Sequence, residues 1–262
     1  MLIIADTIEE IRKTHPKVVG FFGAPPRELL LSVAKQRGAR LVDLDIDLQA
    51  PQKNWVPKAY CHIIRNCVDN AAALEGALVS VVAATGKEKC DAGRFAAWLI
   101  RERMGIEVIF TECTKMPDAT PPYLCEALGP VKKRAIRIMR GIVEPITLEE
   151  QRAAAAERCE PTHGFWGTPP HPIEVLDLFP DTTHLFGWTR CVEQNRPADL
   201  DLETVVTPGL PTVFFSQGFC QKAALAKHLA EKHGGIHVDV HDTLNAAVLA
   251  KIEAFIRLAV PG

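Results

Sequence analysis

Short apolar runs alternate with longer amphipathic segments along the chain. The apolar runs are four to seven residues long, a length typical of buried strands. In the first half of the chain they predict strands at 18–22, 40–44, 78–84 and 105–111. In the second half they predict strands at 184–188, 211–216 and 236–239, after an aromatic segment at 164–166.

The segments between these runs have helical periodicity. They predict helices at 7–15, 25–36, 56–75, 90–103, 220–232 and 246–258, with a wholly helical region over 121–159. In the helix over 25–36, we expect Leu29, Leu30, Leu31 and Val33 to form the buried face. Strands that alternate with helices favour right-handed crossovers and a parallel, doubly wound sheet, so the fold class is α/β.

One short segment occurs twice. Gly164-Phe165-Trp166-Gly167-Thr168-Pro169-Pro170 repeats Gly20-Phe21-Phe22-Gly23-Ala24-Pro25-Pro26 at an offset of 144 residues. Each copy precedes a predicted apolar helix with Glu-(Leu/Val)-Leu, so the repeat predicts two similar Rossmann-like lobes, each with a mainly parallel sheet. We expect an N-terminal lobe over 1–120, a helical connector over 121–160 and a C-terminal lobe over 161–262.

The longest stretch without a predicted element is 194–209, which contains Pro197, Pro208 and several acids. Such a stretch is a lid, a partner contact or an ordinary surface excursion, and the sequence leaves these alternatives open. Basic residues gather over 121–159, at Lys132, Lys133, Arg134, Arg137 and Arg140. That face is either simply solvated or able to meet an acyl-CoA phosphate or an acidic partner.

Composition describes an ordinary globular chain: 262 residues, 47% of them hydrophobic, with a net charge of -2. Nothing in it suggests a nucleic-acid partner. Five apolar residues at the start, followed by Asp6, Glu9 and Glu10, make neither a signal peptide nor a membrane span, so we expect a cytoplasmic protein. The eight cysteines are then expected to be reduced thiols or metal ligands, and the lack of a Cys-x-x-Cys pair argues against zinc.

Two cysteines stand in positions typical of a site. Cys90 follows the apolar strand and Gly86 and opens a helix, which would deliver it to the carboxyl edge of the sheet. Cys61 begins the preceding helical segment and is the cysteine best placed to face it. Any single cysteine is nevertheless more often a small buried hydrophobe than a ligand.

Several blocks resemble the 2-hydroxyacyl-CoA dehydratase and benzoyl-CoA reductase superfamily. They are Pro26-Arg27-Glu28-Leu29-Leu30, Cys61-His62-Ile63-Ile64-Arg65, Cys90-Asp91 with Arg94 and Trp98, Val213 to Cys220, and Gly235-Ile236-His237-Val238-Asp239 followed by Lys251-Ile252-Glu253-Ala254-Phe255. They occur in the family's order, and together they cover nearly the whole chain as a compact version of the family's longer subunits.

The resemblance implies a [4Fe–4S] cluster held by Cys61, Cys90 and Cys220 at a cleft between the lobes. Three thiolates leave one iron open for a substrate oxygen, and helix N-termini favour thiolates. It further implies an anaerobic lyase or oxidoreductase subunit that receives a low-potential electron from an ATP-dependent activator and passes it to a bound thioester, such as an acyl-CoA, or to another small substrate. The partner would be a homologous subunit or a second copy.

Other residues have open roles. Arg65 is a candidate anchor for a carboxylate or phosphate, or a structural salt bridge, whereas His62 stands where the family usually has proline. Ala24 replaces a hydroxyl residue found in many relatives, which puts substrate activation by that group in doubt. The remaining cysteines are interpreted as core or incidental, with Cys191 the first candidate for an additional role; they are Cys67, Cys113, Cys125, Cys159 and Cys191.

Two hypotheses therefore remain. The retained cysteine trio favours a catalytic iron–sulfur subunit, and the shortened middle region favours a non-catalytic cluster-holding or scaffold partner of a larger homologous subunit. An α/β nucleotide-binding protein ranks last, because the chain has neither Gly-x-Gly-x-x-Gly nor Gly-Lys-Ser/Thr.

Overall fold

The computed structural model describes residues 2–3, 7–86, 90–116, 119–241 and 245–259. The chain divides into two compact units, each with its own parallel sheet. The first unit contains Met1–Thr114 and the short segment Ile142–Glu144, and the second contains Lys115–Gly141 and Pro145–Gly262. The predicted α/β class with two Rossmann-like lobes is confirmed.

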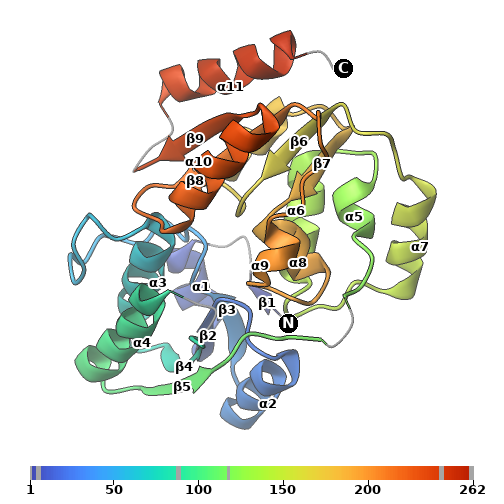
Figure 1. The fold of residues 1–262 in the computed structure, drawn as a ribbon. Helices are drawn as coiled ribbons and strands as arrows, with labels where there is room; N and C mark the ends of the chain where they lie inside the picture. Colours follow the sequence, from blue (N-terminus) through green and yellow to red (C-terminus); the bar gives the residue numbers. More distant parts are fainter. Residues whose placement is uncertain (1, 4–6, 87–89, 117–118, 242–244, 260–262) are drawn as a thin grey trace. The chain divides into compact units, whose positions relative to one another are not determined.

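The first sheet has five parallel strands in the order β1-β3-β2-β4-β5 (Figure 1). Their bounds are Leu2–Ile3, Arg40–Asp43, Val18–Phe22, Leu78–Ala84 and Glu107–Thr111, in that order across the sheet. The strand predicted over 78–84 therefore has the expected bounds. β2 is buried at every position, because helices cover both faces of the sheet.

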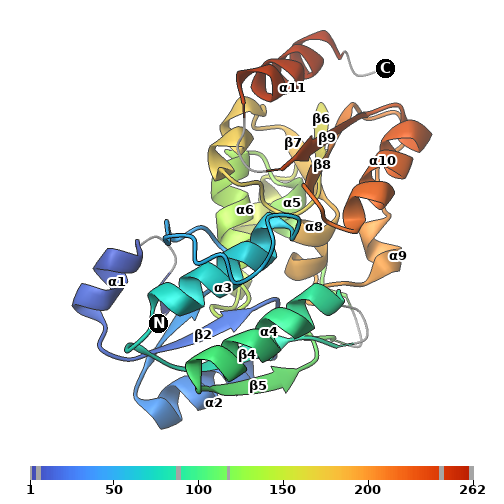
Figure 2. The ribbon, with the colours of Figure 1, turned by 90° about the vertical axis from the view of Figure 1, so that its left-hand side faces the viewer.

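Four helices cover the first sheet: α1 (Ile8–Thr14), α2 (Arg27–Arg37), α3 (His62–Ala73) and α4 (Asp91–Met104). Residues of α1, α3 and α4 share one hydrophobic cluster with alternate residues of the strands, and α2 covers the opposite face (Figure 2). On α2, Leu30 and Val33 are buried as expected, but Leu31 is 46% exposed. Its neighbour Leu30 already occupies the core-facing position, and adjacent helical residues point 100° apart.

The second sheet has four parallel strands in the order β7-β6-β8-β9. Their bounds are Thr183–Phe186, His163–Trp166, Thr212–Gln217 and Ile236–Val240. Aromatic rings fill both faces of this sheet. Phe165 packs edge-on to Phe179 on one face, and Trp166 and Phe214 cluster with α10 (Lys222–His233) on the other.

Three helices of the second unit come from the region expected as a connector: α5 (Tyr123–Glu126), α6 (Val131–Arg140) and α7 (Leu148–Ala156). They group with the second unit. α5 packs against α6 and α7, and α5 and α6 both pack against α8 (Trp188–Glu193). Arg134 of α6 is buried, and its guanidinium donates to the carbonyl oxygens of Leu124, Gly129 and Thr183 at 3.0, 2.9 and 2.7 Å. This side chain therefore joins α5 and α6 to β7.

The internal repeat is preserved in the topology. β2 and β6 occupy equivalent central positions, and each sheet places the second strand of the repeat on one side of it and the third on the other. After each of these strands, Gly23 and Gly167 adopt positive φ of 72° and 143°. The following segment differs, because α2 is matched by a six-residue 3-10 helix, η1 (Ile173–Leu178), where a longer helix was expected.

The segment over 194–209 is not structureless. It contains α9 (Leu200–Glu203), which is capped by Asp199 through the backbone amides of Asp201 and Leu202. Glu203 is buried and pairs with Lys222 of α10 at 2.5 Å, while its carbonyl accepts from Trp166 Nε1 at 2.7 Å. The sequence prediction missed these contacts because they join residues far apart in the chain.

The chain ends in α11 (Ala246–Leu258), which has the predicted bounds and contacts β9 and η1. Within the described part of the chain, every helix is too short or too polar to cross a lipid bilayer.

Candidate functional site

Cys61 is the N-cap residue of α3. Its backbone is extended, with φ -60° and ψ 154°, and its side chain caps no amide of the first turn. The side chain is half-buried in a small apolar cluster that includes Ile64 and Val68 of the same helix, Ala92 of α4 and Trp55. The thiol is therefore held at the N-terminus of α3.

Cys90 has the same position on the neighbouring helix. It is the N-cap of α4, with φ -71° and ψ 146°, and it also caps no amide with its side chain. α3 and α4 pack against each other, and a Cβ on Gly93 would lie 3.7 Å from Ile64 Cδ1, so the two helices approach closely in their first turns. Within the first unit, the fold thus brings the N-termini that carry Cys61 and Cys90 together.

Cys220 lies in the second unit, between β8 and α10, and is half-buried. Its amide donates to the carbonyl of Gln217 at 3.0 Å, which closes the turn after the strand. Counted from the first strand of the repeat, β8 is the third strand after β6 and β7, as β4 is the third after β2 and β3, so Cys220 and Cys90 are topologically equivalent. Each precedes the helix that follows the third strand.

The turn before Cys220 is strained. Phe219 adopts φ 61°, a left-handed conformation that bulky residues rarely take, and its ring is 58% exposed. It contacts the ring of His241 edge-on, with 4.9 Å between centroids. A Cβ on Gly218 would lie 2.4 Å from His241 Cα, so only glycine fits there.

Three of the remaining cysteines are fully buried. Burial raises the pKa of Cys67 and Cys125 well above the usual value, with the nearby carboxylates of Asp45 and Glu193 adding to the effect. Burial also raises the pKa of Cys191 to about 12, and its thiol donates to the carbonyl of Asp199 at 3.7 Å. Such thiols stay protonated, so Cys191 is a poor candidate for a thiolate ligand.

Arg65 lies one turn after Cys61 on α3 and is 8% exposed. Its Nη2 is 3.4 Å from Nδ1 of His62, so these two side chains at the start of α3 contact each other. Because Arg65 is buried beside the helix start that carries Cys61, it can add positive charge there, but it presents little surface to a dissolved ligand.

A pair of carboxyl groups near this helix was missed in the sequence. Asp45 follows β3, and its Oδ2 accepts from the amide of Gly23 at 2.7 Å while its Oδ1 accepts from the Cys67 thiol at 3.1 Å. Asp43 is buried, and burial, together with the charge of Asp45, raises its pKa well above the usual value. The Asp-x-Asp spacing at the end of the strand predicted over 40–44 was the signal available.

A second polar group in the second unit was also missed. The Ser216 hydroxyl donates to Asp239 Oδ1 at 2.6 Å and lies 2.9 Å from His237 Nε2. A hydroxyl has one hydrogen, so His237 is the donor to Ser216, and burial lowers the pKa of His237. His237, Asp239 and His241 alternate along β9 and just beyond it, a period-2 pattern that was visible in the sequence.

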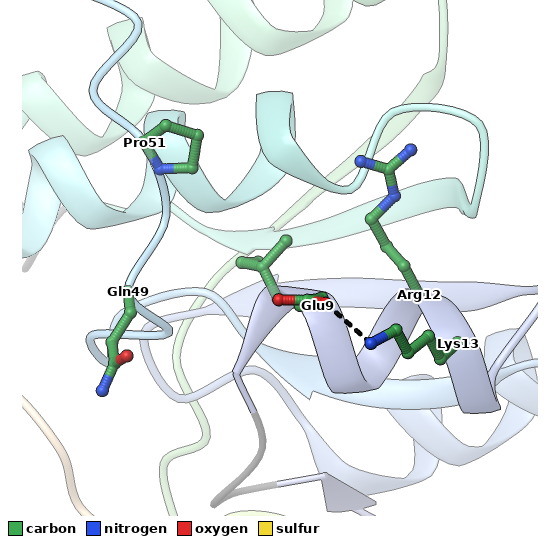
Figure 3. Close-up of a pocket in the computed structure, with 6 residues that line it drawn as sticks. Glu9, Arg12, Lys13, Gln49 and Pro51 are labelled. Atoms are coloured by element: carbon green, nitrogen blue, oxygen red, sulfur yellow. Dashed lines mark hydrogen bonds and ion pairs between the residues drawn. The ribbon is translucent and has the colours of Figure 1, made fainter.

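The surface hollow in Figure 3 lies on α1 and the segment after β3. Ile8, Glu9, Arg12, Lys13, Gln49 and Pro51 line it. Its charged pair, Glu9 and Lys13, is joined at 2.6 Å and exposed. An exposed pair of this kind contributes little binding energy, so the hollow has no evident chemical role.

Among the residues that the structure describes, no three His, Cys, Asp or Glu side chains gather as a metal-binding group. Cys61 and Cys90 belong to the first unit and Cys220 to the second. Searches for related proteins found that no family model, no curated protein and no solved structure matches this chain.

Proposed function

We propose that the chain is an iron–sulfur protein in which Cys61, Cys90 and Cys220 are the thiolate ligands of a [4Fe–4S] cluster. It would serve as a subunit of a system similar to 2-hydroxyacyl-CoA dehydratase or benzoyl-CoA reductase, accepting a low-potential electron for the reduction or radical dehydration of a thioester or other small substrate. The observation that carries the proposal is the position of Cys61 and Cys90 as N-caps of two helices in contact.

The donor set suits the cluster. Iron–sulfur clusters require soft thiolates, and a three-cysteine set leaves one iron available to another ligand. All three cysteines are half-buried at or just before helix starts, whereas Cys67, Cys125 and Cys191 are fully buried. Bound there, the cluster would supply one-electron chemistry, and Arg65 beside Cys61 would offset part of its negative charge.

The proposed partners follow from the resemblance in the sequence. They are an ATP-dependent activator that delivers the electron, a homologous subunit or second copy, and an acyl-CoA as substrate. The proposed location is the cytoplasm.

A second candidate is a non-catalytic cluster-holding or scaffold partner of a larger homologous subunit. It is favoured by three of the five basic residues named in this region, Lys132, Arg134 and Arg137, which are engaged within the protein. Arg137 forms two hydrogen bonds to Glu150 at 2.6 and 2.8 Å, and Lys132 pairs with Asp177 at 3.1 Å. With Arg134 also bonded to carbonyl oxygens, this segment has few cations left for an acyl-CoA phosphate.

Anaerobic purification and iron analysis test cluster binding. We expect about four irons per chain and a broad charge-transfer band that bleaches on reduction. Cys90→Ser and Cys220→Ser should each lower the iron content, because serine replaces a soft thiolate with a hard hydroxyl. Cys67→Ser is the matched control, since this buried residue lies on α3 but is not a proposed ligand. Iron-free protein after anaerobic reconstitution, or equal iron in Cys220→Ser and Cys67→Ser, would overturn the proposed ligand set.

Acyl-CoA binding separates the two candidates. A catalytic subunit should bind an acyl-CoA in calorimetric titrations of the cluster-loaded protein, and a scaffold should not. Iron-loaded protein that binds no acyl-CoA would support the scaffold.

A further inference from the structure

The outer face of α4 carries exposed aromatic rings. Phe95 is 61% and Trp98 is 49% exposed, and Phe110 of the neighbouring strand β5 is 40% exposed. The guanidinium of Arg101 lies over the Phe110 ring, 5.8 Å from its centroid. We call these four residues, together with Arg94 and Glu102, the α4 patch.

The sequence of α4 explains why this face points outward. With 3.6 residues per turn, Gly93, Ala96, Ala97 and Ile100 form the buried stripe, and all four are buried. Arg94, Trp98 and Glu102, at intervals of four, lie on the opposite side. α4 therefore has a complete core-facing stripe without the residues of the patch. Phe95 and Trp98 lie outside that stripe.

Leaving aromatic side chains of this size in contact with water is energetically unfavourable. Trp and Phe bury large areas when they are covered, and clusters of them on a surface mark interaction sites more often than isolated apolar residues do. Trp and Arg are also the residues that most often dominate the binding energy of protein interfaces. β5 is the last strand of its sheet on this side, so nothing in that sheet extends beyond the patch.

The charges of the α4 patch are complementary to those of the same patch on a second copy related by a two-fold axis. Arg94 and Glu102 lie one turn before and one turn after Trp98, about 6 Å along the helix in each direction. In a two-fold pair of antiparallel α4 helices centred on Trp98, Arg94 of each copy lies level with Glu102 of the other. Arg94 forms no ion pair with any described residue of its own chain, whereas Arg101 is paired with Glu102 at 3.0 Å.

From this complementarity we propose that the α4 patch is the contact of a two-fold homodimer, with α4 packed antiparallel to α4 of a second copy. Trp98 lies at the centre, and the two Arg94–Glu102 pairs flank it. Such an isologous contact uses the same residues on both subunits, which is the commonest form of oligomer interface. The proposal does not depend on the cluster.

Sedimentation velocity over a concentration series tests the proposal. The wild-type chain should be a dimer, and Trp98→Glu should be a monomer with unchanged circular dichroism. Leu148→Glu is the control, since Leu148 is 70% exposed on α7 and should leave the dimer intact. A monomeric wild type, including one that associates only with a different subunit, would overturn the proposal, as would a dimer that survives Trp98→Glu.

A charge exchange tests the antiparallel register. Arg94→Glu and Glu102→Arg should each weaken dimerisation by about tenfold or more, because like charges then face each other across the contact. The double variant restores both pairs and should return the dissociation constant to near the wild-type value. These two positions are eight residues apart on one helix and cannot compensate within a single chain. Additive weakening in the double variant would rule out this register.

Discussion

Cys67 donates its thiol hydrogen to Oδ1 of Asp45 at 3.1 Å, while Oδ2 of the same carboxylate accepts from the amide of Gly23 at 2.7 Å. α3 is thereby tied to the turn that follows β2. Asn66 adds to this connection by donating to the carbonyl of Asp45 at 3.1 Å. The helix that begins at Cys61 is therefore fixed in position by residues that play no part in the proposed ligand set.

Burial should divide the cysteines by their reactivity. Cys67, Cys125 and Cys191 have raised pKa values and no exposed surface, so they should resist alkylation by iodoacetamide in the folded, iron-free protein. The half-buried Cys61, Cys90 and Cys220 should be modified much faster. Mass spectrometry of peptides after timed quenching measures each site. Rapid labelling of Cys67 in folded protein would contradict the buried hydrogen bond to Asp45.

Asp43 should make stability depend on pH. Its folded-state pKa is raised by burial, so its contribution to stability is fully present below the unfolded pKa of about 4 and is lost as the pH rises through the folded value. Asp43→Asn keeps an acceptor for the Asp45 amide but cannot ionise. At neutral pH, the variant should be more stable by about 1.4 kcal/mol for each unit of the pKa rise.

Urea unfolding of both proteins from acid to neutral pH checks this expectation. The two stability curves should converge at low pH and separate as the pH rises. Parallel curves would mean that Asp43 titrates normally.

Arg134 should be essential to the second unit. Replacing it with methionine removes the donors to the carbonyls of Leu124, Gly129 and Thr183 and leaves these oxygens unsatisfied. We expect a loss of about 3 kcal/mol or more in the free energy of unfolding. Lys133→Met, at an exposed position on the same helix, is the control and should change stability by less than about 0.5 kcal/mol. Equal urea midpoints for the two variants would contradict this role of Arg134.

The segment over 194–209 should behave as an ordered part of the second unit. Asp199→Ala removes the cap of α9 and the partner of Arg196, which should cost about 1–2 kcal/mol in stability. In hydrogen exchange, the amides of Asp201 and Leu202 should lose protection in the variant. A wild-type segment that exchanges at the rate of an unfolded chain would show that these contacts do not persist in solution.

The central strands β2, β4 and β8 are rich in apolar residues, whereas β9 alternates apolar and polar residues. Apolar periodicity therefore predicted most strands and helices, but not the two-residue strand β1. It failed where the outcome depends on residues distant in the chain. The helix expected over 56–75 begins only at His62, after an irregular segment that contains Pro51 and Pro57. The second copy of the repeat leads into the 3-10 helix η1 despite sharing Glu-x-Leu with α2.

In the candidate site, too, features set by the local sequence could be predicted and features set by distant residues could not. The position of Cys90 at the start of a helix was predicted, because this cysteine stands directly before a helical pattern. The N-cap position of Cys61 was not, because the predicted helix over 56–75 contained this residue, whereas α3 begins at His62. The contact between Ser216 and Asp239 could not be predicted, because it depends on the parallel register that pairs these residues across β8 and β9. Whether Cys220 joins the other two in one cluster stays a prediction for iron analysis.

Both central strands of the repeat carry a glycine at which any side chain would crowd a buried neighbour. A Cβ on Gly20 would lie 2.6 Å from Leu44 Cδ1, and a Cβ on Gly164 would lie 2.4 Å from Thr212 Oγ1. Each close approach lies within one unit, so an alanine at either position should destabilise only that lobe. Gly20→Ala and Gly164→Ala therefore each destabilise one chosen lobe. If the lobes unfold independently, calorimetry should show one transition at lower temperature and the other unchanged; if they unfold as one cooperative unit, the single transition should shift in both variants.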